Sequence, residues 1–206
     1  FIEVETPMLH PIAGGAAAKP FVTHHNALDQ ELYLRIAPEL YLKRLVVGGF
    51  DGVYELNRCF RNEGISTRHN PEFTTVELYV AHHDYEWMMD FVENILKTIA
   101  AKVVSDPSAV SYGTTTINFQ QPFARMTMQE AVMKYGNCSA QELENTIDTV
   151  LKKHAITLAS EHASWGQKLL ALFEHIAEHQ LIQPTFITQF PIEISPLAKK
   201  NTNNRA

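Results

Sequence analysis

Several side chains on either side of a charged loop have the chemistry to bind a ligand with both anionic and cationic groups. An arginine guanidinium binds phosphate or carboxylate oxygens through parallel N–H donors, an aromatic ring stacks on a flat base, and a carboxylate accepts an ammonium group. The chain carries these groups close together in the sequence, at Arg61, Glu63, Phe73, Glu77 and Tyr79. A purely structural hairpin seldom needs all of them on one side. The set therefore indicates a site for a ligand with a phosphate, a flat base and an ammonium group.

The segment from Val53 to Val80 is predicted to form two strands joined by that loop. Successive side chains of a strand point to opposite faces of the sheet. Alternation therefore places two sets of side chains on a shared face of the hairpin: Glu55, Asn57, Cys59, Arg61 and Glu63 from the first arm, and Phe73, Thr75, Glu77 and Tyr79 from the return arm. We expect the opposite face, which includes Val76 and Leu78, to be buried against a core.

The residues alone leave a structural interpretation open for the central arginine. Arg61 could be a surface residue that pairs with Glu63 or Glu77. The adjacent histidine pairs at positions 24–25 and 82–83 do not predict a metal site, because neighbours on a strand point in opposite directions. No cysteine or carboxylate at metal-ligand spacing joins these pairs.

The composition is typical of a globular cytoplasmic domain. The length of 206 residues suits one domain with an inserted subdomain. The hydrophobic content of 45% is ordinary for a globular core. Two cysteines do not make a disulfide framework, no run of about 18 apolar residues predicts a membrane span, and the first residues lack a signal-peptide pattern. We therefore expect a cytoplasmic protein with no membrane partner. The net charge of −6 gives no support to a nucleic-acid partner, because it argues against a strong phosphate-binding surface on this chain.

Helix signals outside the hairpin predict a mixed core and a helical segment. Pro38 is expected to begin a helix at Glu39–Val47, which ends at the Gly48-Gly49 pair. Three capping-box patterns predict helix starts after Thr127, Ser139 and Ser164. The other expected elements are strands at Leu32–Ile36, Thr115–Phe119 and Thr185–Gln189, and helices at Asp84–Val104, Met128–Lys134, Ala140–His154 and Trp165–His179.

The hairpin resembles a known motif. FRNEGISTRHNPEFT, continuing into ELY, is similar to motif 2 of class II aminoacyl-tRNA synthetases in its lysyl-tRNA synthetase form, and FIEVETPML resembles the end of motif 1, the dimer-forming element. The resemblance continues to the PTFITQFPIEISPLAKKN tail and so covers essentially the whole chain. It implies an α/β (α+β) fold, a class II synthetase-type antiparallel β-sheet flanked by helices. The implied domains are a catalytic core at 1–125, a helical insertion at 126–183 and a return to the core at 184–206.

The activity implied by the resemblance is that of a lysine–tRNA ligase. Such an enzyme activates lysine with ATP to lysyl-adenylate and transfers it to tRNA(Lys), with Mg²⁺ as cofactor and as a homodimer. The resemblance further implies a partial catalytic domain: we expect an anticodon-binding domain before Phe1, and motif 3 and the magnesium ligands beyond Ala206. No metal ligand is therefore expected within this chain, and we expect these residues alone to be inactive. A paralogous lysyl ligase that modifies an elongation factor and a non-catalytic synthetase-like module are the alternatives.

The resemblance also implies roles on the ATP side of the site. Arg61 is the expected catalytic residue, bridging the carboxylate of lysine and the α-phosphate of ATP. Glu63 is expected to meet the adenine amino group, and Phe73 to stack on the adenine ring. His69 is expected near the terminal phosphates, although a solvated loop histidine is its structural alternative. Asn70 is expected to shape the turn and to contact the nucleotide through its backbone.

Lysine carries two ammonium groups and therefore calls for carboxylates at both ends. The resemblance implies that Glu39 and the Gly15 carbonyl meet the α-amino group, while Arg61 binds the carboxylate. Glu77 and Tyr79 are expected to lie toward the ε-ammonium. The structural alternative for Glu77 is a buried partner of an arginine in the motif.

Overall fold

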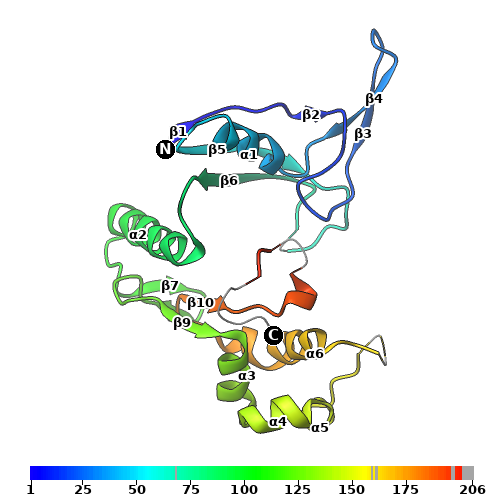
Figure 1. Ribbon diagram of the computed structural model, residues 1–206. Helices are drawn as coiled ribbons and strands as arrows, with labels where there is room; N and C mark the ends of the chain where they lie inside the picture. The colour runs from blue at the N-terminus through cyan, green and yellow to red at the C-terminus, as the bar shows by residue number, and fades with distance from the viewer. Residues whose placement is uncertain (68, 159, 161, 196–197, 201–206) are drawn as a thin grey trace. The chain divides into compact units, whose positions relative to one another are not determined.

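The computed structural model describes residues 1–67, 69–158, 160, 162–195 and 198–200 (Figure 1). The chain divides into two compact units, Phe1–Asp84 (unit 1) and Tyr85–Ala206 (unit 2). Antiparallel ladders with accompanying helices make up a mixed α/β structure, which agrees with the predicted fold class. The domain limits expected at residues 125 and 183 stay a prediction.

A long β-hairpin forms the centre of unit 1. β5 (Gly52–Phe60) and β6 (Glu72–Val80) pair antiparallel over their full length, and β1 (Ile2–Glu3) adds a short parallel strand at the other edge of β5. A second sheet in the same unit has three antiparallel strands, which in spatial order are β2 (Leu9–His10), β4 (Gln30–Leu34) and β3 (Val22–His25).

The predicted strand Leu32–Ile36 is observed as β4, which ends before Arg35. The Arg35 N–H donates to the Met8 carbonyl at 2.8 Å, and the Arg35 carbonyl accepts the Phe60 N–H at 2.9 Å. Both backbone groups of Arg35 are therefore used to join other segments. Arg35 connects the second sheet to the end of β5.

Helix α1 (Glu39–Val47) has the predicted bounds. It begins after Pro38 and ends at Gly48, whose N–H donates to the Arg44 carbonyl. Proline suits a helix start because its ring fixes φ and it has no N–H to leave unpaired. α1 packs against β5 and β6, and its Leu42 side chain is fully buried there (Figure 1).

The predicted burial of Val76 is wrong. Val76 is 56% exposed and Leu56, its direct partner across the β5–β6 ladder, is 58% exposed, while Leu78 is half-buried. Helix α1 and the segment around Thr6 pack on the polar face of the hairpin instead, where Glu55 is almost fully buried. The described part of the chain leaves the apolar face partly uncovered.

Unit 2 contains helices and two small strand pairs. Its strands are the antiparallel pair β7 (Val110–Tyr112) and β8 (Thr115–Ile117), and the parallel pair β9 (Ala124–Thr127) and β10 (Thr185–Thr188). Its α-helices are α2 (Tyr85–Val103), α3 (Met128–Gly136), α4 (Ala140–Asn145), α5 (Ile147–Lys153) and α6 (Trp165–Leu172). In the described ranges, no helix combines the length and the apolarity that crossing a bilayer requires.

The three predicted capping boxes are confirmed at the starts of α3, α4 and α6. Two expected helices end early. The single helix expected at Ala140–His154 is two helices, because the backbone of Thr146 between them departs from helical geometry, with φ −139° and ψ 35°. The helix expected at Trp165–His179 changes after Leu172 into a π-helical turn, η1 (Phe173–Ala177), and then a 3₁₀ turn, η2 (Glu178–Gln180).

Replacing the cap of α3 should destabilise unit 2. Thr127 accepts the Glu130 N–H at 3.0 Å, and Glu130 accepts the Thr127 N–H at 2.7 Å. We expect Thr127→Ala to lower the free energy of unfolding by about 1 kcal/mol, because one helix-end donor loses its partner. Urea unfolding of the intact protein measures this change. Thr157→Ala, at an exposed loop position, is the control; an equal loss in both variants would contradict the capping account.

Candidate active site

The register of β5 and β6 brings the predicted side chains to one face of the hairpin. Glu55 pairs with Glu77, and Cys59 pairs with Phe73. Directly opposite residues of an antiparallel pair lie on the same face. The Arg61 N–H donates to the Pro71 carbonyl at 2.8 Å and so extends the ladder past the end of β5.

Past the end of the ladder, the hairpin loop encloses a small hollow of about 210 Å³. All five side chains that the resemblance assigns to ATP line it, and the full lining is Arg61, Glu63, Gly64, His69, Asn70, Pro71 and Phe73. The His69 Nδ1 lies 2.8 Å from the Ser66 hydroxyl, and the two residues also exchange backbone hydrogen bonds. These bonds hold the His69 ring within the loop, while His69 itself remains exposed, so its role near the terminal phosphates stays a prediction.

The guanidinium of Arg61 has no anionic partner in the described part of the chain. No carboxylate there lies within 4.0 Å of it, and its buried Nε lacks a hydrogen-bond partner. Its only close aromatic contact in those residues is Phe73, whose ring centroid lies 5.1 Å from the guanidinium carbon. The surface ion pair with Glu63 or Glu77 is therefore not formed. A partly buried cation without a partner favours an anionic ligand.

Gly15 brings its backbone close to the start of α1. A Cβ at this position would lie 3.3 Å from the Ala37 Cβ and 3.5 Å from the Glu39 Cβ, and its φ of +92° favours glycine. The loop that contains Gly15 is also tied to the hairpin, since the Asn62 N–H donates to the Lys19 carbonyl at 2.7 Å. Gly15 and Glu39, the expected α-amino contacts, thus lie together.

Glu77 and Tyr79 form a half-buried acidic pair on the same face. The Tyr79 hydroxyl donates to Glu77 Oε2 at 3.0 Å. Burial raises the pKa of Glu77, and the nearby Glu39 carboxylate adds to this rise against the lowering effect of the Tyr79 hydrogen bond. Burial, followed by the charge of Glu77, raises the pKa of Tyr79. An ammonium ligand would relieve the repulsion between these carboxylates.

Glu39 has a competing cation in its own helix. Its carboxylate pairs with Lys43 one turn further along α1. The Lys43 side chain is 57% exposed, and such exposed pairs contribute little to stability. Glu39 can therefore exchange this partner for a ligand ammonium at small free-energy cost.

Sequence reasoning missed one important residue. Arg35 is 1% exposed and forms an ion pair of 2.6 Å with Glu55, which is also 1% exposed. Alternation places Glu55 on the correct face but gives it no role, and no sequence motif points to Arg35. The available signal was a charged residue inside the apolar run LYLRIAP, because a charge in such a run is rarely buried without a partner.

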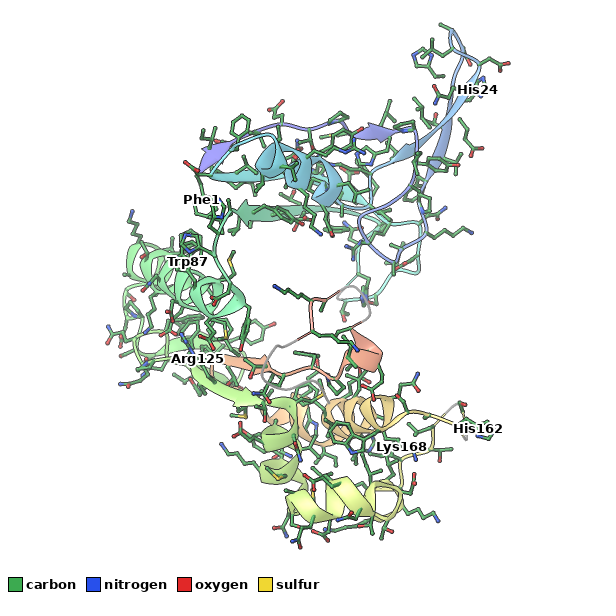
Figure 2. All side chains as sticks on the ribbon, viewed as in Figure 1. Phe1, His24, Trp87, Arg125, His162 and Lys168 are labelled. Atoms are coloured by element: carbon green, nitrogen blue, oxygen red, sulfur yellow. The ribbon has the colours of Figure 1, made fainter. Side chains whose placement is uncertain are left out.

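The other candidate chemistry in the chain does not form a site. His24 pairs with Asp29 at 3.2 Å on the exposed β3–β4 hairpin (Figure 2). Burial raises the pKa of the Cys59 thiol, which makes it a poor nucleophile. Within the described ranges, no group of three or more His, Cys, Asp or Glu side chains could hold a metal ion. These residues therefore do not by themselves fit the magnesium ion that the resemblance implies.

A second hollow, of about 380 Å³, lies in unit 2 beside Asp90, Glu93 and Arg125. Its charges are already paired with one another. Arg125 pairs with Asp90 and lies 3.5 Å from Glu93, which also binds Lys97 at 2.6 Å. This hollow offers a ligand no unpaired charge of the kind found at Arg61.

Comparison with known proteins identifies the class of the chain. The family model described as tRNA synthetases class II (D, K and N) matches residues 1–206. The chain therefore belongs to the class II tRNA synthetases, as the resemblance of its hairpin to motif 2 indicated.

Its similar relatives are proteins named lysine–tRNA ligase. The chain is 53% identical to the one from Tolumonas auensis over 221 residues, 56% to that from Actinobacillus succinogenes over 208, and 53% to that from Legionella pneumophila over 208. Each match covers 99% of this chain and 41% of the relative. The chain thus spans about two fifths of the length of these relatives, and the resemblance to the lysyl enzymes is confirmed.

Glu77→Gln should stabilise the folded protein near neutral pH. Because the folded state raises the pKa of Glu77, it binds more protons than the unfolded chain between the two pKa values, and stability falls as the pH rises through that window. Glutamine carries no such penalty and still accepts the Tyr79 hydrogen bond.

Urea unfolding of the intact protein between about pH 4 and pH 8 checks this. The variant should be more stable than wild type at the upper end, and the difference should fade toward the lower end. Glu72→Gln is the matched control, since Glu72 is an exposed carboxylate on the same strand that pairs with Arg58 at 2.6 Å. A Glu77→Gln variant less stable than wild type near neutral pH would contradict the assigned burial.

Proposed function

We propose that this chain forms part of a lysine–tRNA ligase, which uses ATP to join lysine to tRNA(Lys). The single observation that carries the proposal is the hollow at the hairpin loop, where an unpaired arginine, an aromatic ring and a carboxylate come together. The half-buried carboxylate of Glu77 on the same face supports an ammonium-bearing substrate. The names of the relatives favour tRNA over an elongation factor as acceptor.

In the first step, a carboxylate oxygen of lysine attacks the α-phosphorus of ATP, and pyrophosphate leaves. Negative charge grows on the phosphoryl oxygens in the transition state. Arg61 binds the lysine carboxylate and the α-phosphate through its planar fork of donors, which brings the two reactants together and stabilises that charge. In the second step, a hydroxyl of tRNA attacks the carbonyl of lysyl-adenylate and AMP leaves. The chemistry depends on position and charge rather than on a side-chain base.

The hairpin loop holds the nucleotide. Phe73 stacks on adenine, and Glu63 accepts a hydrogen bond from the adenine amino group. His69 contacts the outer phosphates from the loop, where Ser66 supports its ring. Asn70 shapes the turn and contacts the nucleotide through its backbone.

The amino-acid end of the site uses its carboxylates to select lysine. Glu39 and the Gly15 carbonyl accept the α-amino group, and Glu77 with Tyr79 accepts the ε-ammonium. Burial raises the pKa of Glu77, which means that the ionised carboxylate is destabilised when no ligand is bound. The ε-ammonium of lysine would stabilise that ionised carboxylate. A neutral side chain of the same length gives no such gain, which is the basis for specificity.

The proposed cofactor is Mg²⁺, which neutralises phosphate charge when bound. The proposed assembly is a cytoplasmic homodimer joined through the first nine residues. Phe1 is 49% exposed and Ile2 is 55% exposed, so apolar surface is available there. Neither the metal nor the dimer is needed for the residue assignments above.

Arg61→Ala in the intact protein should reduce lysine-dependent ATP–pyrophosphate exchange by about 100- to 1000-fold. The loss of one preorganised charge contact in such a site costs on the order of 3–4 kcal/mol. Arg61→Lys should recover little, since an ammonium cannot bridge carboxylate and phosphate with fork geometry. His69→Ala should be milder, because its contact leaves the attacked phosphorus in place.

Arg58→Ala is the matched control for this series. Arg58 lies on the opposite face of β5, is half exposed and pairs with Glu72. Its loss should leave exchange close to that of wild type. Near-normal exchange by Arg61→Ala, or an equal loss in Arg58→Ala, would refute the proposed role of Arg61.

A further inference from the structure

The most deeply buried charges of unit 1, Arg35 and Glu55, form a network next to the proposed lysine site. Arg35 NH1 binds Glu55 Oε1 at 2.6 Å, and Arg35 Nε donates to the Arg58 carbonyl at 2.7 Å. Glu55 also accepts the Thr6 N–H at 3.2 Å, the Thr6 hydroxyl at 2.6 Å and the Asn57 side-chain amide at 3.2 Å. Four donors therefore fix the Glu55 carboxylate.

Glu55 lies directly opposite Glu77 in the ladder. Like charges at opposite positions of an antiparallel pair repel each other. Arg35 is the buried cation near both, and its charge acts on Glu77 as well as on Glu55. The Arg35 guanidinium could therefore form an ion pair with either of two carboxylates, Glu55 or Glu77.

In the structure, Arg35 forms its ion pair with Glu55 and not with Glu77. In the described residues Glu77 has no cation within 4.0 Å, and its hydrogen bond there comes from the neutral Tyr79 hydroxyl. Arg35 NH2 is buried and has no hydrogen-bond partner among those residues. Among the described residues, Arg35 thus keeps one buried donor without a partner while Glu77 has no cation, so the arrangement does not maximise pairing.

Stability alone does not account for this arrangement. A buried ion pair often contributes no more to stability than apolar residues of similar volume. A network selected only for stability would also satisfy the buried NH2, since an unpaired buried donor is unfavourable. The effect of pairing Arg35 with Glu55 is that the negative charge of Glu77 is not neutralised by a cation from the described residues.

We propose that Glu55 is a specificity-determining residue: it binds the buried Arg35 guanidinium and so keeps that cation from neutralising Glu77, which stays open to the ε-ammonium of lysine. Glu55 acts through Arg35 and Glu77 and is a positioning residue. Thr6 and Asn57 assist by fixing the Glu55 carboxylate. This inference rests on the proposed function, because it assumes that Glu77 receives the ammonium group.

The test compares lysine with 2-aminohexanoate, which has the same carbon chain without the ε-ammonium, in ATP–pyrophosphate exchange by the intact protein. Glu55→Gln keeps the side-chain shape and frees Arg35 to pair with Glu77. The KM for lysine should rise at least about tenfold, as expected for the loss of a hydrogen bond to a charged group. The KM for 2-aminohexanoate and the KM for ATP should stay within about twofold of wild type.

Removing the cation should reverse the defect. Arg35→Met in the Glu55→Gln background takes away the group that neutralises Glu77, so the KM for lysine should return toward the wild-type value. A purely structural role for the pair predicts the opposite, since the double variant lacks still more polar contacts. Glu72→Gln, which removes the partner of Arg58 on the other face, is the control and should leave the KM for lysine unchanged.

Thr6→Val is the second variant, and it retains both charges. It removes the hydroxyl that holds Glu55 Oε2 and should shift the ratio of the two KM values in the same direction by a few fold. An unchanged ratio in Glu55→Gln or, should that variant not fold, in Thr6→Val would overturn the inference. Equal losses for both amino acids, or failed rescue by the double variant, would also overturn it. A wild-type protein without lysine-dependent exchange would instead overturn the proposed function, and this inference with it.

Discussion

The antiparallel register of β5 and β6 is the constraint on which the candidate site depends. It places Glu55 opposite Glu77 and Cys59 opposite Phe73, and it carries Arg61 to the same face just past the end of β5. A slip of one residue would turn every side chain of one strand to the other face. The register is stabilised from outside the hairpin, because Arg35 binds the backbone of Phe60 and the side chain of Glu55.

Among the described residues, charge is distributed unevenly over this face of the hairpin, with a cation that lacks an anion at one end and a carboxylate that lacks a cation at the other. At the loop end, the guanidinium of Arg61 lacks an anion; at the α1 end, Glu77 lacks a cation within the described chain. A ligand with a phosphate at one end and an ammonium group at the other would satisfy both. Between the two ends, Arg35 and Glu55 satisfy each other. The hairpin face is thus polarised along its length, in the sense that the proposed lysine and ATP require.

The sequence was sufficient to predict the local elements with strong signals. Strict alternation predicted the hairpin, Pro38 and the Gly48-Gly49 pair bounded α1, and the capping residues marked three helix starts. These features depend on neighbouring residues, so local physical rules are enough to find them. The resemblance to motif 2 then supplied the family, which no composition or periodicity could have identified.

The features that could not be predicted depend on packing between distant segments. Alternation correctly separated the two faces of the hairpin but did not say which would be covered, and the apolar Val76 lies on the less covered face. Arg35 pairs with Glu55, 20 residues away, and with Thr6, 29 residues away. The break at Thr146 is likewise hidden from local patterning, because Leu143 of α4 and Ile147 and Val150 of α5 all belong to one buried cluster.

The most direct test of the central claim is a crystal structure of the intact protein with lysine and a non-hydrolysable ATP analogue. We expect adenine against Phe73, the α-phosphate and the lysine carboxylate on Arg61, and the ε-ammonium on Glu77, with Arg35 still bound to Glu55. A nucleotide bound on the face of Val76 and Leu56, or a lysine whose ε-ammonium lies away from Glu77, would contradict it.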